Sequence, residues 1–507
     1  MKLLICIGLL LVTLTKDFAQ RSVLSYPFEF EKSFLQKSDY DAYFLDNKAA
    51  QSFAFILKDN KKADYVLADK NFKVISKFTK KIDETIFSHG GEKYLGGTAI
   101  NNVYHYLYKV FDKKFMSTKI TYMEETIDFD KKQVSSNTAF EIPKEEKLLV
   151  SFSDNNRYFS ITANKKGGNL NFYVISSNGD AVTKDVHFTI PPGKDRKKDE
   201  MSEYLNGIKV IKQNEEPGLE TANGSAKLYS YPDKLVFAVN DGDNPTQLVT
   251  VDLNTFSNQE RFIDHSSMLE KGKHDKSYVS SYLKDNKLFT LILNKKDTKI
   301  AIYDASSGDL LNSHVINDES SLNELAEMPV AETRKGKKTS EKEVNDMHKI
   351  IKVFTKGTEG IAVSTNQANQ YVLKVGTYDL IQIGGGGGSG YMGGFQQGTP
   401  ISTGAGPIPN YYYNPYMYYV PGSSGYTTTN ARYYTSTYFK MLLDPSTLNK
   451  TKGKIPPSIG DQVKDYMNDA DQKAKAVKQF EMSGNQYYGF YNKDSKVYEV
   501  DQIMIKK

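Results

Sequence analysis

The stretch Ile300-Ala301-Ile302-Tyr303-Asp304, followed by the turn Ser306-Ser307-Gly308, decides the fold. Apolar and aromatic side chains run up to a single aspartate, and small polar residues follow it at once. Ile and Tyr favour strands, whereas Asp, Ser and Gly favour tight turns for separate steric and hydrogen-bonding reasons. The stretch therefore predicts a β-strand that ends at Asp304 and turns sharply.

The same strand–turn unit recurs along the chain, which makes an internal repeat the first feature to account for. The six other copies are residues 63–69, 106–112, 170–175, 248–252, 438–444 and 496–501. A further strand pattern precedes most copies across a polar turn, at 52–57, 158–163, 235–239, 288–293 and 487–491. Asn, Asp and Gly suit such hairpin turns because they tolerate positive φ. The repeat predicts an all-β fold.

A small antiparallel sheet repeated around an axis is the blade of a β-propeller, where stacking buries both faces of each sheet. On these strand–Asp–turn units the chain resembles β-propeller proteins, in particular exported propellers of the TolB-like or WD40-like type. The resemblance covers most of the chain and implies seven blades, to within one, with loop and short helical insertions. The chain contains no Trp, so the WD dipeptide and the other tryptophan signatures of named propeller families are missing.

Ring closure is predicted from an early strand-like stretch that has no hairpin partner of its own. Residues 26–34 form this stretch, and the last strand–turn unit stands close to the end of the sequence. Propellers commonly close by pairing an N-terminal strand into the last blade. We therefore expect residues 26–34 to pair with the last blade.

The first residues predict export. Lys2 precedes the apolar run 3–14, and Ala19 offers a small residue for cleavage, so 1–19 is interpreted as a signal peptide. Residues 20–507 are then a single propeller domain without a transmembrane segment, placed in the periplasm or at the cell surface. The only cysteine, Cys6, lies inside the predicted signal, which leaves no thiol for a disulfide or a thiolate metal site.

Charge composition argues against a nucleic-acid partner. The chain has 66 Lys and Arg residues against 61 Asp and Glu residues, a formal net charge of +5. Nucleic-acid binding needs basic residues concentrated on one face, and this near balance gives no sign of that.

Four stretches are interpreted as insertions into the repeat: 191–227, 317–349, 384–435 and 449–482. The second contains a capping-box pattern from Ser321 to Glu324 and a basic run, 334–338, interpreted as solvated loop. The fourth predicts an amphipathic helix packed on its own protein, because apolar residues share one face at helical spacing. Those residues are Val463, Tyr466, Met467, Ala470, Ala474, Val477 and Phe480.

The third insertion, 384–435, is predicted to be a flexible Gly- and Tyr-rich loop at the tip of one hairpin. Five consecutive glycines, 384–388, open it. Tyrosines spaced by small residues can make adaptable contacts, as in antibody loops. The candidate partner-binding residues are Tyr411, Tyr412, Tyr413, Tyr416, Tyr418 and Tyr419, and an inert surface tract is the alternative.

No catalytic, cofactor or metal residues are assigned. The seven histidines form no metal-binding spacing. The match of Gly388, Gly390 and Gly393 to a dinucleotide fingerprint lacks the helix that would hold a pyrophosphate. The sequence therefore favours a non-catalytic, exported binding or scaffold protein with a protein partner in the cell envelope. A propeller enzyme or glycan-binding protein acting at the channel mouth, and a structural or adhesive surface component, remain open alternatives.

Overall fold

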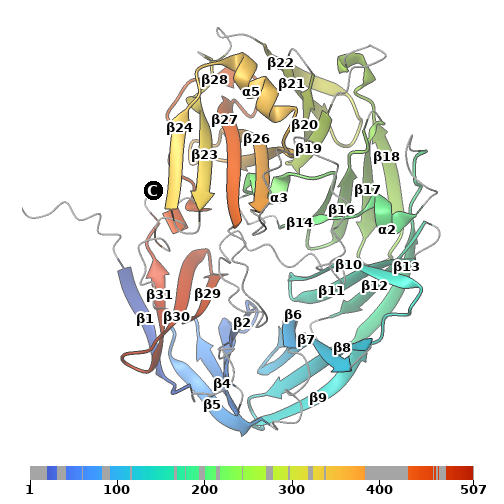
Figure 1. Cartoon of the computed structure of the whole chain (residues 1–507). Coiled ribbons are helices and arrows are strands. Elements are labelled where there is room, and N and C mark those ends of the chain that lie inside the picture. The colour runs from blue at the N-terminus through green and yellow to red at the C-terminus, as the bar shows by residue number, and fades with distance from the viewer. Residues whose placement is uncertain are drawn as a thin grey trace, which may run out of the picture.

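Seven β-sheets are arranged around a central axis in the computed structural model, so the chain is a seven-bladed β-propeller (Figure 1). The predicted fold class and blade number are confirmed. The structure describes residues 20–30, 41–59, 61–82, 92–114, 117–164, 168–176, 179–192, 200–212, 217–242, 244–269, 278–294, 297–317, 322, 324–335, 338–382, 432–460, 462–463, 466 and 475–505.

Blades 1 to 3 and blade 5 are regular four-stranded antiparallel sheets in chain order. Blade 1 contains β2 (Asp41–Asn47), β3 (Ser52–Lys58), β4 (Lys62–Asp69) and β5 (Val74–Lys81). Blade 2 contains β6 (Glu92–Ile100), β7 (Val103–Lys114), β8 (Ser117–Asp128) and β9 (Gln133–Phe140). Blade 3 contains β10 (Glu146–Asp154), β11 (Arg157–Asn164), β12 (Asn169–Ile175) and β13 (Ala181–His187). Blade 5 contains β19 (Tyr278–Lys284), β20 (Lys287–Leu293), β21 (Thr298–Asp304) and β22 (Leu310–Ile316).

Blades 4, 6 and 7 depart from this plan. Blade 4 adds β14 (Lys209–Lys212), parallel to β15 (Ala226–Ser230), before β16 (Lys234–Val239), β17 (Thr246–Asp252) and β18 (Asn258–Ile263). Blade 6 contains β25 (Glu359–Thr365), β26 (Tyr371–Gln382), β27 (Arg432–Leu443) and β28 (Lys450–Thr451), extended by β23 (Glu327–Lys335) and β24 (Lys338–Glu343). Blade 7 contains β29 (Lys475–Met482), β30 (Asn485–Asn492), β31 (Val497–Ile503) and β1 (Gln20–Pro27).

Helices are few and short among the described residues. Those with described bounds are α2 (Met201–Tyr204), α3 (Leu219–Ala222), α5 (Met347–Phe354) and the 3-10 turn η1 (Ser266–Met268). Helical residues also occur at 322, 459–460, 462–463 and 466. None of the described helices has the length and apolar character needed to cross a membrane.

Position within a blade decides how each strand is patterned. β3 lies inside blade 1 and is buried along nearly its whole length, because neighbouring blades cover both faces. β5 lies at the outer rim and is largely exposed. Inner strands therefore look like continuous apolar runs in the sequence, and outer strands look polar. This difference explains why the second and third strands of the blades formed the repeat that is visible in the sequence.

The aspartate of the repeat builds the turn between the third and fourth strands. Asp252, Asp304 and Asp444 each accept hydrogen bonds from the backbone N–H groups two and three residues later. The N–H of the residue four positions on donates to the backbone carbonyl of the same aspartate. That residue has positive φ in all three turns, and in blade 5 it is Gly308. These backbone bonds lower the pKa of each aspartate.

We expect Asp304→Ala to lower the free energy of unfolding by roughly 1 kcal/mol, because two turn N–H groups lose their acceptor at an exposed site. Asp304→Asn retains an acceptor oxygen and should lose less. The folded pKa is lowered, so the stabilisation is present above the unfolded pKa and is lost as pH falls through the folded pKa. Urea unfolding at neutral and acid pH measures the difference. Asp309→Ala, an exposed change in the same turn, is the control.

The ring closes as expected, with different strand bounds. β1 pairs antiparallel with β31, from Gln20 opposite Ile503 to Pro27 opposite Val497. The pairing strand thus begins earlier and ends earlier than the predicted 26–34, and residues 31–40 lie outside the described residues. Every second side chain is buried from Leu24 to Phe30, so the apolar alternation continues beyond the ladder.

The predicted helix in 449–482 is wrong at its C-terminal end. Val477 and Phe480 belong to β29, the inner strand of blade 7, and Phe480 stacks on Phe44 of blade 1 with ring centroids 4.3 Å apart. Pairing with β30 overrides the helical spacing of the sequence. Val463 and Tyr466 are helical and buried, whereas Met467, Ala470 and Ala474 lie outside the described residues.

Two other insertions contribute strands to blades. The stretch 191–227 supplies β14 and the start of β15, and 317–349 supplies β23 and β24. Part of the basic run interpreted as solvated loop therefore lies in strands: Arg334 and Lys335 end β23, and Lys338 begins β24. Charged edge strands are hard to distinguish from loops in a sequence, because charged side chains commonly protect a free sheet edge from pairing with other chains.

The repeat unit predicted at 106–112 is also misplaced. It lies in β7, the second strand of blade 2, whereas the third strand, β8, ends at Asp128.

Candidate functional site

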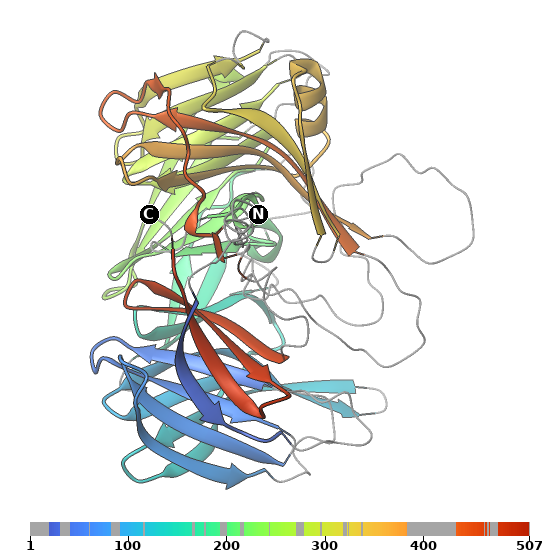
Figure 2. The same ribbon diagram turned by 90° about the vertical axis from the view of Figure 1, so that its left-hand side faces the viewer.

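One blade boundary lacks the packing that joins the others. Clusters of buried apolar side chains bridge blades 1–2, 2–3, 3–4, 4–5–6 and 7–1. In the described part of the chain, none bridges blades 6 and 7. We call this boundary the seam; blade 6 lies above blade 7 in both ribbon views (Figures 1 and 2).

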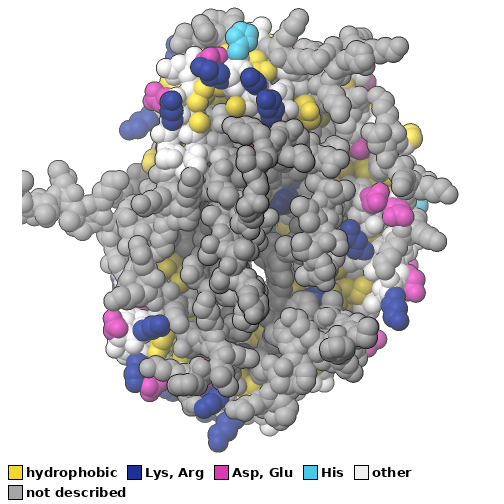
Figure 3. Space-filling model, viewed as in Figure 1, with side chains coloured by type: hydrophobic (Ala, Val, Ile, Leu, Met, Phe, Trp, Pro, Cys, Tyr) yellow, Lys and Arg dark blue, Asp and Glu magenta, His cyan; other side chains and the backbone are white. Residues whose placement is uncertain are grey.

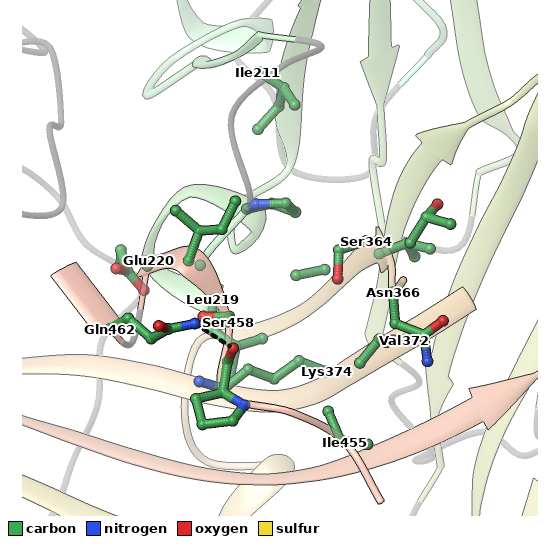
Figure 4. A pocket seen from close by; sticks show the side chains of 18 of the residues that line it. Ile211, Leu219, Glu220, Ser364, Asn366, Val372, Lys374, Ile455, Ser458 and Gln462 are labelled. Carbon is green, nitrogen blue, oxygen red and sulfur yellow. Dashed lines mark hydrogen bonds between the residues drawn. The ribbon is translucent and has the colours of Figure 1, made fainter. Parts of the chain in front are cut away.

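A pocket of about 710 Å³ lies at the seam and reaches the inner strands of blades 4 and 5. Blade 6 contributes its sheet face, and blade 7 contributes residues 484–486 and 502–505. The segment 455–462 crosses between them. Figure 4 shows side chains from these parts: Ile211, Leu219, Glu220, Ser364, Asn366, Val372, Lys374, Ile455, Ser458 and Gln462. The lining mixes apolar, amide, hydroxyl and charged groups, as ligand sites do.

The two faces of the blade 6 sheet differ in chemistry because side chains alternate along each strand. One face carries Leu373, Val375 and Phe439 into the large apolar cluster. The opposite face lines the pocket. Its side chains include Ser364, Val372, Lys374, Tyr378, Tyr434, Ser436, Lys440 and Glu332. Within the described residues none of these side chains joins an apolar cluster with another blade, so this face can carry polar groups.

Side-chain hydrogen bonds of Gln462 and Tyr466 hold the segment that crosses the seam in place. Gln462 donates its side-chain amide to the Pro457 carbonyl at 3.2 Å (Figure 4). Tyr466 donates its hydroxyl to Asp501 of β31 at 3.0 Å, and its ring contacts Tyr488. Burial, followed by the nearby Asp501 carboxylate, raises the pKa of Tyr466. These contacts attach one wall of the pocket to blade 7.

The candidate tyrosines 411–413, 416, 418 and 419 lie outside the described residues. The strands that flank them are described, and Gln382 of β26 pairs with Arg432 of β27. Residues 383–431 thus connect two paired strands, as the hairpin interpretation expected, but the predicted insertion is too wide because residues 432–435 belong to β27. Tyr378 and Tyr434 stack at 5.4 Å on these same strands and line the pocket.

Sequence reasoning missed a buried cation at the boundary of blades 4 and 5. Lys227 of β15 has 0% exposure and donates to the Gly224 carbonyl at 2.9 Å and to Ser280 at 3.4 Å. Burial lowers the pKa of Lys227 to about 7, despite the favourable charge of Glu359. Burial also raises the pKa of Glu359. A lysine in a strand pattern resembles a solvent-facing residue, so no sequence signal marked it.

A second pair that the sequence did not indicate lies in blade 2, across the ring from blade 6 (Figure 1). His105 Nδ1 lies 2.5 Å from Glu124 Oε1, and His105 is 8% exposed. Thr126 completes the group at 3.4 Å. A histidine oriented by a carboxylate occurs in catalytic sites, but this pair lies in a different blade from the seam pocket.

Within the described residues, no group of three or more His, Cys, Asp or Glu side chains is placed to hold a metal ion. Basic and acidic side chains are interspersed around the described rim of the face in Figure 3. The visible part of that face therefore has no patch of a single charge sign.

No protein-family model matches the sequence, and no curated protein does. Solved structures with similar folds include the WD40 domain of SCAP from fission yeast, at 8% identity and a TM-score of 0.27, covering 98% of this chain and 90% of that one. The β-propeller domain of the Trilobed protease from Pyrococcus furiosus matches at 6% identity and a TM-score of 0.26, covering 82% and 94%. At such TM-scores neither match carries an argument about function.

Proposed function

We propose that this chain is an exported, non-catalytic binding protein of the cell envelope, and that it takes a segment of a partner protein into the pocket at the seam. The observation that carries the proposal is the pocket itself, about 710 Å³ at the one described blade boundary without an apolar cluster. Ligand sites typically fall between roughly 300 and 1,000 Å³.

The lining chemistry supports a partner that is bound rather than converted. Tyr229, Tyr231, Tyr282, Tyr378 and Tyr434 border the pocket, beside amide and hydroxyl side chains. Tyrosine offers large contact area at low entropic cost, and small polar groups offer adaptable hydrogen bonds, a combination typical of binding surfaces. Two of these tyrosines, Tyr378 and Tyr434, lie on β26 and β27, the strands that the tract with the six candidate tyrosines connects.

We expect Ser364→Trp to abolish partner recovery, because Ser364 is a half-buried residue of β25 at the pocket wall and an indole would fill the space (Figure 4). Recovery from a native envelope extract, followed by affinity measurement with the purified partner, should show at least about tenfold weaker binding. The matched control is Ser135→Trp on the exposed outer strand of blade 2.

Deletion of 384–431, which leaves β27 and its pocket-lining residues in place, separates the two parts of the proposal. Loss of binding in both the deletion and Ser364→Trp assigns the partner to the pocket and the tract together. Full binding by a folded Ser364→Trp protein would exclude the pocket as the partner site.

A further inference from the structure

Two lysines face each other on the floor of the seam pocket. Lys374 of β26 is the direct cross-strand partner of Lys440 of β27, and both line the pocket. Like charges directly opposite each other in a sheet are unfavourable. The arrangement therefore calls for negative charge nearby.

The protein supplies that charge to only one of the two lysines. Lys440 forms an ion pair with Glu327 at 3.1 Å. Lys374 instead places its ammonium 4.0 Å from the ring centroid of Tyr438. Within the described residues, no carboxylate oxygen lies within 4.0 Å of Lys374. A cation–π contact leaves the N–H donors of an ammonium available to an acceptor.

Polar side chains line the same pocket as this ammonium. Val372, two residues before Lys374, is the partner of Ser364 on β25, so the serine lies diagonally across from the lysine on the same face. Figure 4 shows the Lys374 side chain extending toward the segment that carries Ser458 and Gln462. A carboxylate at the end of this side chain would form a charge-assisted hydrogen bond with the ammonium, which is stronger than a neutral one.

We propose that the seam pocket recognises a carboxylate on an extended polypeptide segment, an Asp or Glu side chain or a C-terminus, and that Lys374 pairs with it. This inference rests on the proposed function and specifies its ligand. Glu327 balances the charge of Lys440, which leaves Lys374 as the cation that can pair with the ligand.

The pocket already accommodates extended backbone. β14 lies along the inner edge of blade 4 as an added strand, parallel to β15, and its last residues, Ile211 and Lys212, line the pocket. The chain itself therefore fills an inner blade edge with a short strand, which is the geometry of strand addition by a bound peptide.

Among the described residues β25 ends the blade 6 sheet; Asn223 bridges it at Gly360, and the stretch near Thr365 borders the pocket. Tyr378 N–H donates to the Thr358 carbonyl, and Asn366 N–H donates to the Gln370 carbonyl, which fixes the alternation of bonds between β25 and β26. By that alternation the peptide groups of Thr365 point away from β26. Thr365 is exposed and borders the pocket. A peptide can therefore pair with this edge while a side-chain carboxylate reaches Lys374.

The test is selection of a random linear peptide library on the full chain, followed by fluorescence anisotropy with the most enriched peptide. We expect enrichment of Asp or Glu, and about tenfold weaker binding when that acid is replaced by its amide. Lys374→Met should weaken binding by a similar factor, and Lys374→Arg should retain most of it. Lys352→Met, an exposed change on α5 outside the pocket, is the control. Melting temperatures confirm folding of each variant.

The remaining outcomes overturn the inference in distinguishable ways. Enriched peptides without Asp or Glu that bind with an amidated C-terminus and lose binding in Ser364→Trp would contradict the carboxylate and leave the pocket as the binding site. Acidic peptides that bind Lys374→Met and the original chain equally would contradict the role of Lys374. Lys374-dependent binding of a labelled oligogalacturonate, with no peptide enriched, would reassign the anion to a glycan and contradict the proposed protein partner as well.

Discussion

Lys227→Met is expected to stabilise the protein at pH 7 and below, by roughly 2–3 kcal/mol. The lysine is completely buried, and its pKa falls from an ordinary 10.5 to about 7. Each unit of pKa shift corresponds to about 1.4 kcal/mol, so the buried charge costs roughly 4–5 kcal/mol when the lysine is protonated. The lost hydrogen bonds to Gly224 and Ser280 offset part of the gain, by about 1–3 kcal/mol.

The sign of the pH dependence follows from proton linkage. The folded pKa is below the unfolded pKa, so between about pH 7 and 10.5 the unfolded chain binds more protons at this site. The stability of the original chain should therefore rise with pH across this window. Lys227→Met should lack that rise, so the two curves approach each other and cross as the pH increases.

Urea unfolding between pH 6.5 and 8.5 measures the first part of this rise before tyrosines, with an ordinary pKa of about 10, ionise appreciably in the unfolded chain. Lys352→Met, which removes an exposed lysine from α5, should show the same pH profile as the original chain. Parallel curves for Lys227→Met and the original chain would mean that Lys227 carries its charge in the folded state at no cost, against the burial argument.

The strand–turn repeat was predictable because it depends on local chemistry. The side chains of Asp252 and Asp444 accept hydrogen bonds from the backbone of the turn that follows each of them. Such an aspartate marks the end of a third strand whatever the neighbouring strands are. Blade 2 shows the limit of the method. Residues 106–112 end in an aspartate inside the long hairpin of β7 and β8, and the residue that binds the turn backbone is Asp128.

The site was less predictable because it depends on register between strands far apart in the sequence. Lys374 and Lys440 become opposite partners only when β26 pairs with β27 across the residues 383–431. The sequence could place the tyrosine tract between two strands, but not the lysine pair beside it. Burial of Lys227 depends likewise on blade 5, which supplies Ser280. A lysine in a strand pattern gives no sign of which blade will cover it.

Because blades 6 and 7 share no apolar cluster among the described residues, the position of blade 7 depends on ring closure. Blade 7 shares apolar clusters with blade 1 and with the segment containing Val463 and Tyr466, and none with blade 6 in the described residues. The pairing of β1 with β31 and the apolar cluster shared with blade 1 therefore hold blade 7 in the ring. Loss of the pairing should loosen blade 7, which forms one wall of the pocket.

Tyr26→Ala should lower the free energy of unfolding by about 3–5 kcal/mol, the usual loss for a large buried aromatic residue. Tyr26 is buried, packs edge-on against Phe55 at 5.6 Å, and donates its hydroxyl to Asp64 of blade 1 at 3.0 Å. Tyr26→Phe retains the ring and should lose only about 1 kcal/mol, the value of the hydroxyl bond. Ser25→Ala, an exposed neighbour on the same strand, should have little effect.

Hydrogen exchange distinguishes closure from general stability. If β1 closes the ring, Tyr26→Ala should first increase the amide exchange rates of β1 and β31, which are hydrogen-bonded to each other. Amides of blades 3 to 5 should exchange faster only at higher temperature or denaturant concentration. Uniform acceleration in every blade would instead mean that the ring unfolds as one unit. Contacts of blade 7 with blade 6 would then stabilise its position as strongly as the pairing of β1 does. The pocket would in that case be a rigid feature of the closed ring.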